Sequence, residues 1–187
     1  MFVNIGGFTV NKLIKTSLYQ KYGIEYPKGI YGCEDQYTMA AIFKHDVKIA
    51  YVPIAFYHYL YYPVSLARYY DENTYEMDLH ILQMFKDLLE GTPAYDYAIR
   101  KKQNSIFIRA FWNGSNYYSS KKFHQMFKNY KHIISSLDEP VVVKFLMWVA
   151  CSGAFSFASK INSILFSLKQ KNMSYYRKSV HHFNLKK

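Results

Sequence analysis

Two adjacent carboxylates, Glu34 and Asp35, stand at the start of a helical pattern that runs to about Lys44. Asp35 lies four and seven residues before Met39 and Ile42, so its carboxylate is expected on the helix face that packs. A charge there needs the N–H groups of a helix N-terminus, and it is useful if a substrate hydroxyl must lose a proton. The pair is interpreted as a general base, or else as two acids that only complement the helix dipole, worth roughly 0.3 to 1 kcal/mol.

Short elements are expected on both sides of this pair. Upstream, apolar spacing predicts a helix over residues 11–22 that ends at Gly23, followed by a loop rich in Gly and Pro. Downstream, residues 47–51 and 55–59 alternate in a way that predicts two short strands. The carboxylates would then start a helix between a loop and a small sheet.

The rest of the chain shows helical periodicity only. Helices are expected at about 75–89, 95–110 and 123–134, with a last one beginning at Asp138-Glu139-Pro140. The predicted fold class is therefore α+β and mostly helical. Two domains are expected, residues 1–70 and 71–187.

Charge is divided unevenly between the two halves. Residues 1–93 hold 8 Lys and Arg against 10 Asp and Glu, whereas residues 94–187 hold 16 against 3. A basic half of this kind suits an anionic membrane surface, phosphorylated substrates or nucleic acid. Nucleic acid is the weakest of these, because the aromatic residues there follow helix faces and no nucleic-acid motif occurs.

A mostly apolar segment, residues 141–158, lies in the basic half. Lys144 and several Ser and Gly residues interrupt it, so it falls short of about 20 apolar residues that span a bilayer. A buried or interfacial helix is predicted instead. The tail that follows is rich in Lys and Arg and suits an anionic lipid surface.

Cysteine usage and the first residues point to the cytosol. Cys33 and Cys151 are far apart, and their spacing suggests neither a zinc site nor a disulfide framework. The N-terminal residues have no basic region followed by an apolar stretch, so no secretory signal is expected.

Several short segments, taken in order, resemble glycosyltransferase family 2, especially bacterial members that build surface polysaccharides. The likeness covers about residues 4–70, and its order and spacing are more specific than any single motif. The segments are Asn11-Lys12-Leu13-Ile14-Lys15, Ile24-Glu25-Tyr26-Pro27-Lys28-Gly29, Cys33-Glu34-Asp35-Gln36, Tyr51-Val52-Pro53, Tyr57-His58-Tyr59 and Ser65-Leu66-Ala67-Arg68. The resemblance implies the C-terminal portion of a GT-A α/β catalytic domain, followed here by a helical extension.

The resemblance assigns the chemistry to the acidic pair. It implies that Asp35 takes the proton from an acceptor hydroxyl as that oxygen attacks the anomeric carbon of the donor sugar, with Glu34 as the orienting neighbour. It also makes His58 the candidate near the metal or the diphosphate. His58 has a competing interpretation as packing or as part of the acceptor wall, because it lies between two tyrosines.

Four further residues of the family-like stretch are candidate acceptor-binding residues. Lys12 and Arg68 are expected to contact phosphate or acceptor groups, with simple solvation as the alternative. Tyr57 and Tyr59 are expected to stack on a sugar, although tyrosines at alternating strand positions also straddle a sheet without binding anything.

One departure from the family bears on the donor. An Asp-x-Asp metal motif does not occur in the sequence, so either a truncated enzyme or one whose missing half is supplied by another chain is expected. In isolation the chain is expected to bind nucleotide sugar weakly or not at all. The implied partners are a nucleotide-diphosphate sugar, a glycan or lipid-linked acceptor, a divalent cation (Mg or Mn) and an anionic membrane. The implied location is the cytoplasmic, inner face of the cell membrane.

A different class of function stays open. In this alternative the chain is a non-catalytic module whose helical half docks on a membrane or a protein, and the acidic pair only starts a helix. Replacement of Asp35 separates the two, because only the enzyme needs its carboxylate.

Overall fold

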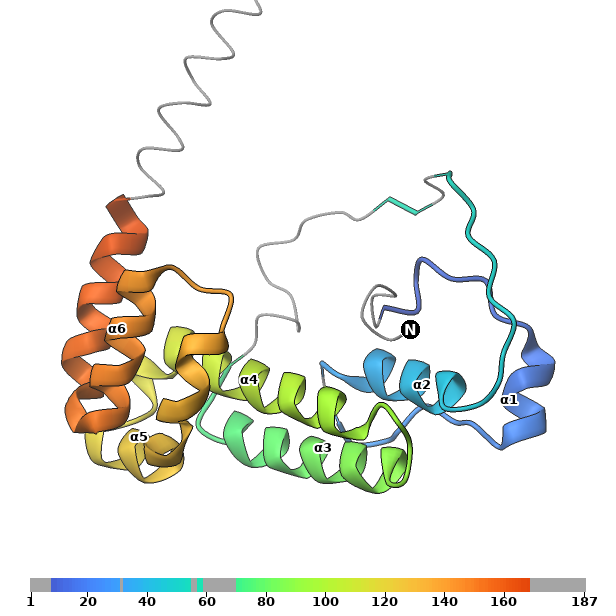
Figure 1. The fold of residues 1–187 in the computed structure, drawn as a ribbon, viewed down its shortest axis with the longest axis horizontal. Coiled ribbons are helices and arrows are strands. Elements are labelled where there is room, and N and C mark those ends of the chain that lie inside the picture. The colour runs from blue at the N-terminus through green and yellow to red at the C-terminus, as the bar shows by residue number, and fades with distance from the viewer. Residues whose placement is uncertain (1–7, 31, 55–56, 59–69, 169–187) are drawn as a thin grey trace, which may run out of the picture. The chain divides into compact units, whose positions relative to one another are not determined.

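The computed structural model describes residues 8–30, 32–54, 57–58 and 70–168, and it divides into two compact units, Met1–Gln103 and Asn104–Lys187 (Figure 1). Within the described residues every regular element is a helix. The first unit holds α1 (Thr16–Tyr22), α2 (Glu34–Phe43), α3 (Thr74–Leu89) and the start of α4 (Tyr95–Asn113). The mostly helical class is confirmed. The domain boundary predicted near residue 70 adjoins undescribed residues and stays a prediction.

The helix predicted over residues 11–22 is shorter than expected. It begins at Thr16, because Lys15 is extended with φ −62° and ψ 125°. Leu13 therefore precedes the helix and its side chain is 92% exposed, instead of joining the packed face. The end is as predicted: Gly23 adopts φ 60°, and its N–H reaches the last turn of α1.

The core of the first unit forms around α2. Met39 and Ile42 are buried there with Ile24, and Leu88 of α3 packs against the same cluster. Met39 and Ile42 are three residues apart, so one helix face carries both into the core. The helix predicted to start at the acidic pair is confirmed, and its packing fixes where the pair lies.

The strand predicted over residues 47–51 is wrong. These residues form no regular element, and the Tyr51 side chain is 88% exposed. A strand needs a partner for its N–H and C=O groups, and the described residues contain no second strand. Of the strand predicted over residues 55–59 the structure describes Tyr57 and His58, and neither is in a strand.

The second unit follows from the end of α4. It contains η2 (Gly114–Asn116), α5 (Ser120–Phe127), η3 (Lys128–Ser136), α6 (Val141–Val149), the π-helical η4 (Ala150–Ala154) and a helical continuation over 155–168. Its core is aromatic. Phe123 and Phe155 stack with ring centroids 4.0 Å apart and planes 4° apart, and Phe107 lies beside Phe127 at 5.2 Å.

The long C-terminal helix is interrupted at Gly153, which adopts φ 106° within η4. Side chains of α5 pair with the backbone groups at this interruption. His124 Nδ1 lies 2.7 Å from the Cys151 carbonyl oxygen, and the Ser156 N–H donates to Ser120 Oγ at 2.9 Å. Because a carbonyl oxygen only accepts, the Nδ1 atom is the donor. Two hydrogen bonds therefore hold the interruption against α5.

Candidate functional site

Asp35 lies in the first turn of α2 and is held by one residue from far upstream. Thr9 Oγ1 donates to Asp35 Oδ1 at 2.7 Å, and the Thr9 N–H donates to Asp35 Oδ2 at 3.4 Å. The carboxylate is part-buried, as its place on the packed side of the helix predicted. Two donors from one residue fix the plane of the carboxylate and leave it lone pairs for a ligand.

A turn before α1 brings Thr9 to this position. The Lys12 N–H donates to the Thr9 carbonyl oxygen at 3.0 Å. The Lys12 ammonium donates to the carbonyl oxygen of Phe8 and, at 2.7 Å, to Asn11 Oδ1. The sequence singled out Lys12 but not Thr9, because nothing local in the sequence links Thr9 to a carboxylate 26 residues later.

The electrostatics place Lys12 and Tyr19 in the field of Asp35. Burial lowers the pKa of the Lys12 ammonium, while the negative charge of Asp35 opposes that change. Burial is also the main reason that the pKa of Tyr19 is raised, followed by Tyr26 and then Asp35. The negative charge of Asp35 therefore acts on both the Lys12 ammonium and the Tyr19 phenol.

Glu34 occupies a different environment from its neighbour. Its Oε2 atom is buried and has no hydrogen-bond partner among the described residues, and the same holds for Thr38 Oγ1 one turn later. Buried polar atoms are normally paired, so these two are exceptions in the first half of α2. The expected orienting role of Glu34 stays a prediction, since Thr9 makes the hydrogen bonds to Asp35 that the structure shows.

A buried lysine lies on the other side of the α2 start. The Lys102 ammonium donates to the sulfur of Cys33, the residue before α2, and it lies 5.2 Å from the centre of the Phe85 ring. Sequence reasoning missed Lys102. A signal was present, because Lys102 shares a face of α4 with Ile99 and Ile106, both of which are buried.

Of the remaining predicted site residues the structure describes Tyr57 and His58, and it shows no contact between either of them and Asp35. Tyr57 and His58 are exposed, and the structure shows no hydrogen bond or ion pair from either to another described residue. Tyr59 and Arg68 lie outside the described residues. Their acceptor-binding roles stay predictions.

Metal binding finds no support around His58. Within the described ranges no group of three or more His, Cys, Asp and Glu side chains could hold a metal ion. A catalytic divalent cation needs several such ligands, and exposed His58 by itself does not fit one. The metal role of His58 stays a prediction.

Comparisons with known proteins do not test the resemblance to glycosyltransferase family 2. No protein-family model, curated protein or solved structure matches the chain. The site is thus defined by its geometry: a carboxylate at the start of α2, oriented by Thr9, with Lys12 and Tyr19 nearby.

Proposed function

We propose that the chain is the acceptor-activating part of a glycosyltransferase that resembles family 2, transferring a sugar from a nucleotide-diphosphate sugar to a glycan or lipid-linked acceptor. The observation that supports this most is the Asp35 carboxylate, part-buried at a helix start and held by two hydrogen bonds from Thr9. A general base has to be oriented and remain within reach of a hydroxyl. Asp35 meets both conditions better than a carboxylate that only complements a helix dipole.

The proposed reaction uses one carboxylate. The acceptor hydroxyl gives its proton to Asp35 while its oxygen attacks the anomeric carbon, and the nucleotide diphosphate leaves from the opposite side. Thr9 orients the carboxylate through its side-chain and backbone hydrogen bonds. Because the sequence lacks Asp-x-Asp, donor and cation binding are assigned to residues outside it, and the isolated chain is expected to be nearly inactive.

The test is sugar transfer by the protein in its native cell membranes. Transfer of labelled sugar from a panel of nucleotide sugars into membrane lipid or polysaccharide is compared for the parent, Asp35→Asn and Asp46→Asn. Asp46 is an exposed acid just after α2, so it is a matched control for loss of one charge. Transfer should fall by about 100-fold or more in Asp35→Asn only. Equal transfer activity in all three proteins would exclude Asp35 as the general base. No transfer by the parent with any donor would exclude the glycosyltransferase function.

A second candidate is the non-catalytic module. It is favoured by the exposed apolar side chains of the long C-terminal helix, which a catalytic role does not require. In this alternative Asp35→Asn leaves every cellular effect of the chain intact. The proposed location at the inner face of the cell membrane is common to both candidates.

A further inference from the structure

The helical stretch Val141–Leu168 is kinked at Gly153, where two helical segments meet. Its buried side chains include Leu146, Met147, Ala150 and Phe155. Among the described residues this is the one helix long and apolar enough to cross a membrane by length and composition. The burial of these side chains argues against crossing, because a spanning helix would have to leave this packing. The interruption at Gly153, fastened to α5, adds to that argument.

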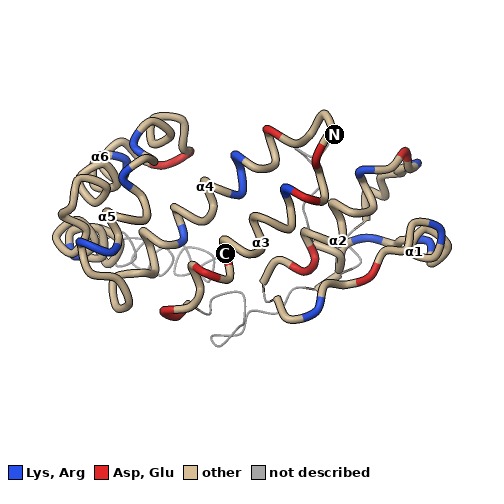
Figure 2. Tube along the Cα trace, turned by 90° about the horizontal axis from the view of Figure 1, so that it is seen from below, with Lys and Arg blue, Asp and Glu red and all other residues tan. Residues whose placement is uncertain are grey.

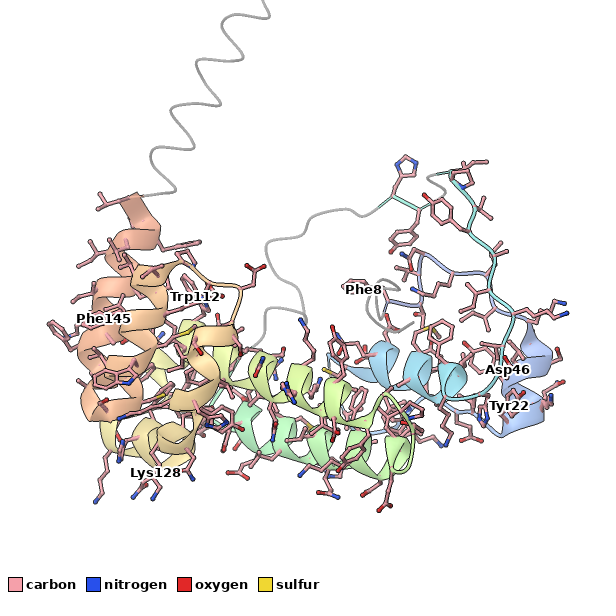
Figure 3. The ribbon with its side chains drawn as sticks, viewed as in Figure 1. Phe8, Tyr22, Asp46, Trp112, Lys128 and Phe145 are labelled. Atoms are coloured by element: carbon pink, nitrogen blue, oxygen red, sulfur yellow. The ribbon has the colours of Figure 1, made fainter. Side chains whose placement is uncertain are left out.

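Several large apolar side chains of α6 are at least half exposed. In α6 the side chains of Phe145 and Trp148 are 63% and 50% exposed, and Figure 3 shows Phe145 pointing away from its helix. After the interruption Phe157 and Ile164 are 62% and 60% exposed. We call the exposed surface of α6 the apolar face: Val141, Val142, Phe145 and Trp148. An exposed patch of this composition marks an interaction site.

Lysines border the apolar face in α6. The Lys131 ammonium lies 4.8 Å from the centre of the Trp148 ring, and Lys144 Nζ donates to the Ser135 carbonyl oxygen at 3.0 Å. Acidic residues are scarce nearby: residues 104–168 contain only Asp138 and Glu139 (Figure 2). The sequence continues with six Lys and Arg and no acid over residues 169–187. The partner of this surface should therefore be apolar in its interior and anionic at its boundary.

We propose that the apolar face docks in the plane of an anionic lipid bilayer, with Phe145 and Trp148 at the boundary of headgroups and acyl chains. Lys131 and Lys144 then contact lipid phosphates. An amphipathic helix with aromatic residues on one side and lysines at its border binds membranes in this way. The assignment gives a surface to the membrane location proposed above, but it does not rest on the transfer chemistry.

Trp148 supplies a direct probe, because the chain has only one other tryptophan, Trp112. The full chain with Trp112→Phe is titrated with vesicles of phosphatidylcholine alone or with phosphatidylglycerol. Emission should shift to shorter wavelength with the anionic vesicles and weaken with added salt. Lipids brominated near the headgroup should quench Trp148 more than lipids brominated near the bilayer centre. Stronger quenching at the centre would instead show a spanning helix and overturn the docking geometry.

A matched pair of variants tests the surface itself. Phe145→Glu places a charge in the apolar face, whereas Gln125→Glu adds the same charge at an exposed position of α5. Phe145→Glu should weaken vesicle binding by about tenfold or more, and Gln125→Glu by much less. Equal loss in both would show that net charge alone drives binding and would overturn the role of the apolar face. Circular dichroism confirms that both variants fold.

The remaining outcomes separate this proposal from its rivals. An emission shift that depends on protein concentration without vesicles, together with a dimer in sedimentation, would assign the face to a second copy of the chain and overturn the proposal. Asp35→Asn should bind vesicles like the parent. If the parent shows no sugar transfer but binds vesicles, the proposed transferase function is contradicted and the docking surface is not. If it transfers sugar but does not bind vesicles, only the docking surface is contradicted.

Discussion

The two units of the chain bury different kinds of side chain. The fully buried large aromatic residues of the described chain, Phe107, Phe111, Phe123, Phe127 and Phe155, all belong to the second unit. The first unit buries the ionisable residues Asp78 and Lys102. Cys151 of the second unit can also ionise, but burial raises its pKa to about 12, so it stays neutral.

This difference suggests that one kind of buried side chain stabilises the fold and the other accompanies a reactive site. Stacked aromatic rings stabilise a fold through burial and ring contacts. Buried charges are unfavourable for folding, and they concentrate where a protein binds or reacts. By this reasoning the aromatic core stabilises the second unit, whereas the buried charges lie in the unit that carries the candidate site.

The largest effect is expected from the aromatic core of the second unit. Phe123→Ala removes a ring stacked on Phe155 and should lower the free energy of unfolding by about 3 to 5 kcal/mol. Phe145→Ala removes an exposed ring of the same size and should change it by less than about 0.5 kcal/mol. Urea unfolding followed by circular dichroism measures both. Similar losses would show that the aromatic core is not the source of stability.

The interruption of the long helix comes next. Gly153→Ala should destabilise the second unit by about 1 to 2 kcal/mol, because φ 106° is unfavourable for a residue with a Cβ atom. Ser152→Ala, at the exposed neighbouring position, should have a smaller effect. Thermal unfolding compares them. A neutral or stabilising Gly153→Ala would mean that the helix tolerates a regular turn there.

The buried lysine of the first unit should matter less for stability than any buried phenylalanine. Lys102→Met keeps most of the volume and removes the desolvated charge, so the free energy of unfolding should stay within about 1 kcal/mol of the parent. Lys101→Met, at an exposed position, is the control. A loss of unfolding free energy as large as that for Phe123→Ala would contradict the contrast between the units. It would show that the buried ammonium of Lys102 stabilises the first unit as much as a buried ring stabilises the second.

The smallest effect concerns pH in the first unit. His45 stacks on Tyr22 with ring centroids 3.8 Å apart, and its pKa is lowered from 6.5 by burial and then by Lys44 and Lys21. The folded state therefore favours the neutral ring. Stability is complete above pH 6.5 and falls slightly as the pH drops through that value, because the unfolded chain takes up the proton first. His45→Gln should remove this slope in melting curves between pH 5 and 7.5. An unchanged slope would assign it to another group.

Prediction from the sequence succeeded where the signal is local. The helix expected at 75–89 is observed as Thr74–Leu89, and Gly23 ends α1 as expected. The strand at 47–51 failed because alternation describes a surface that fits a sheet but does not supply the neighbouring strand. Asp35 was predicted from its place at a helix start and stays a candidate, whereas Tyr57 and His58 were selected by position in a family-like segment and have no observed contact with it.

The sequence by itself determined the mostly helical class, the charge difference between the halves and the position of the acidic pair at a helix start, because each depends on composition or on residues a few positions apart. The tertiary structure alone decided that Thr9 orients Asp35 and that Lys102 reaches Cys33, contacts that join residues 26 and 69 positions apart. It also decided which side chains of the long helix stay exposed. Such pairings depend on how helices pack, and periodicity within one helix carries no information about its neighbour.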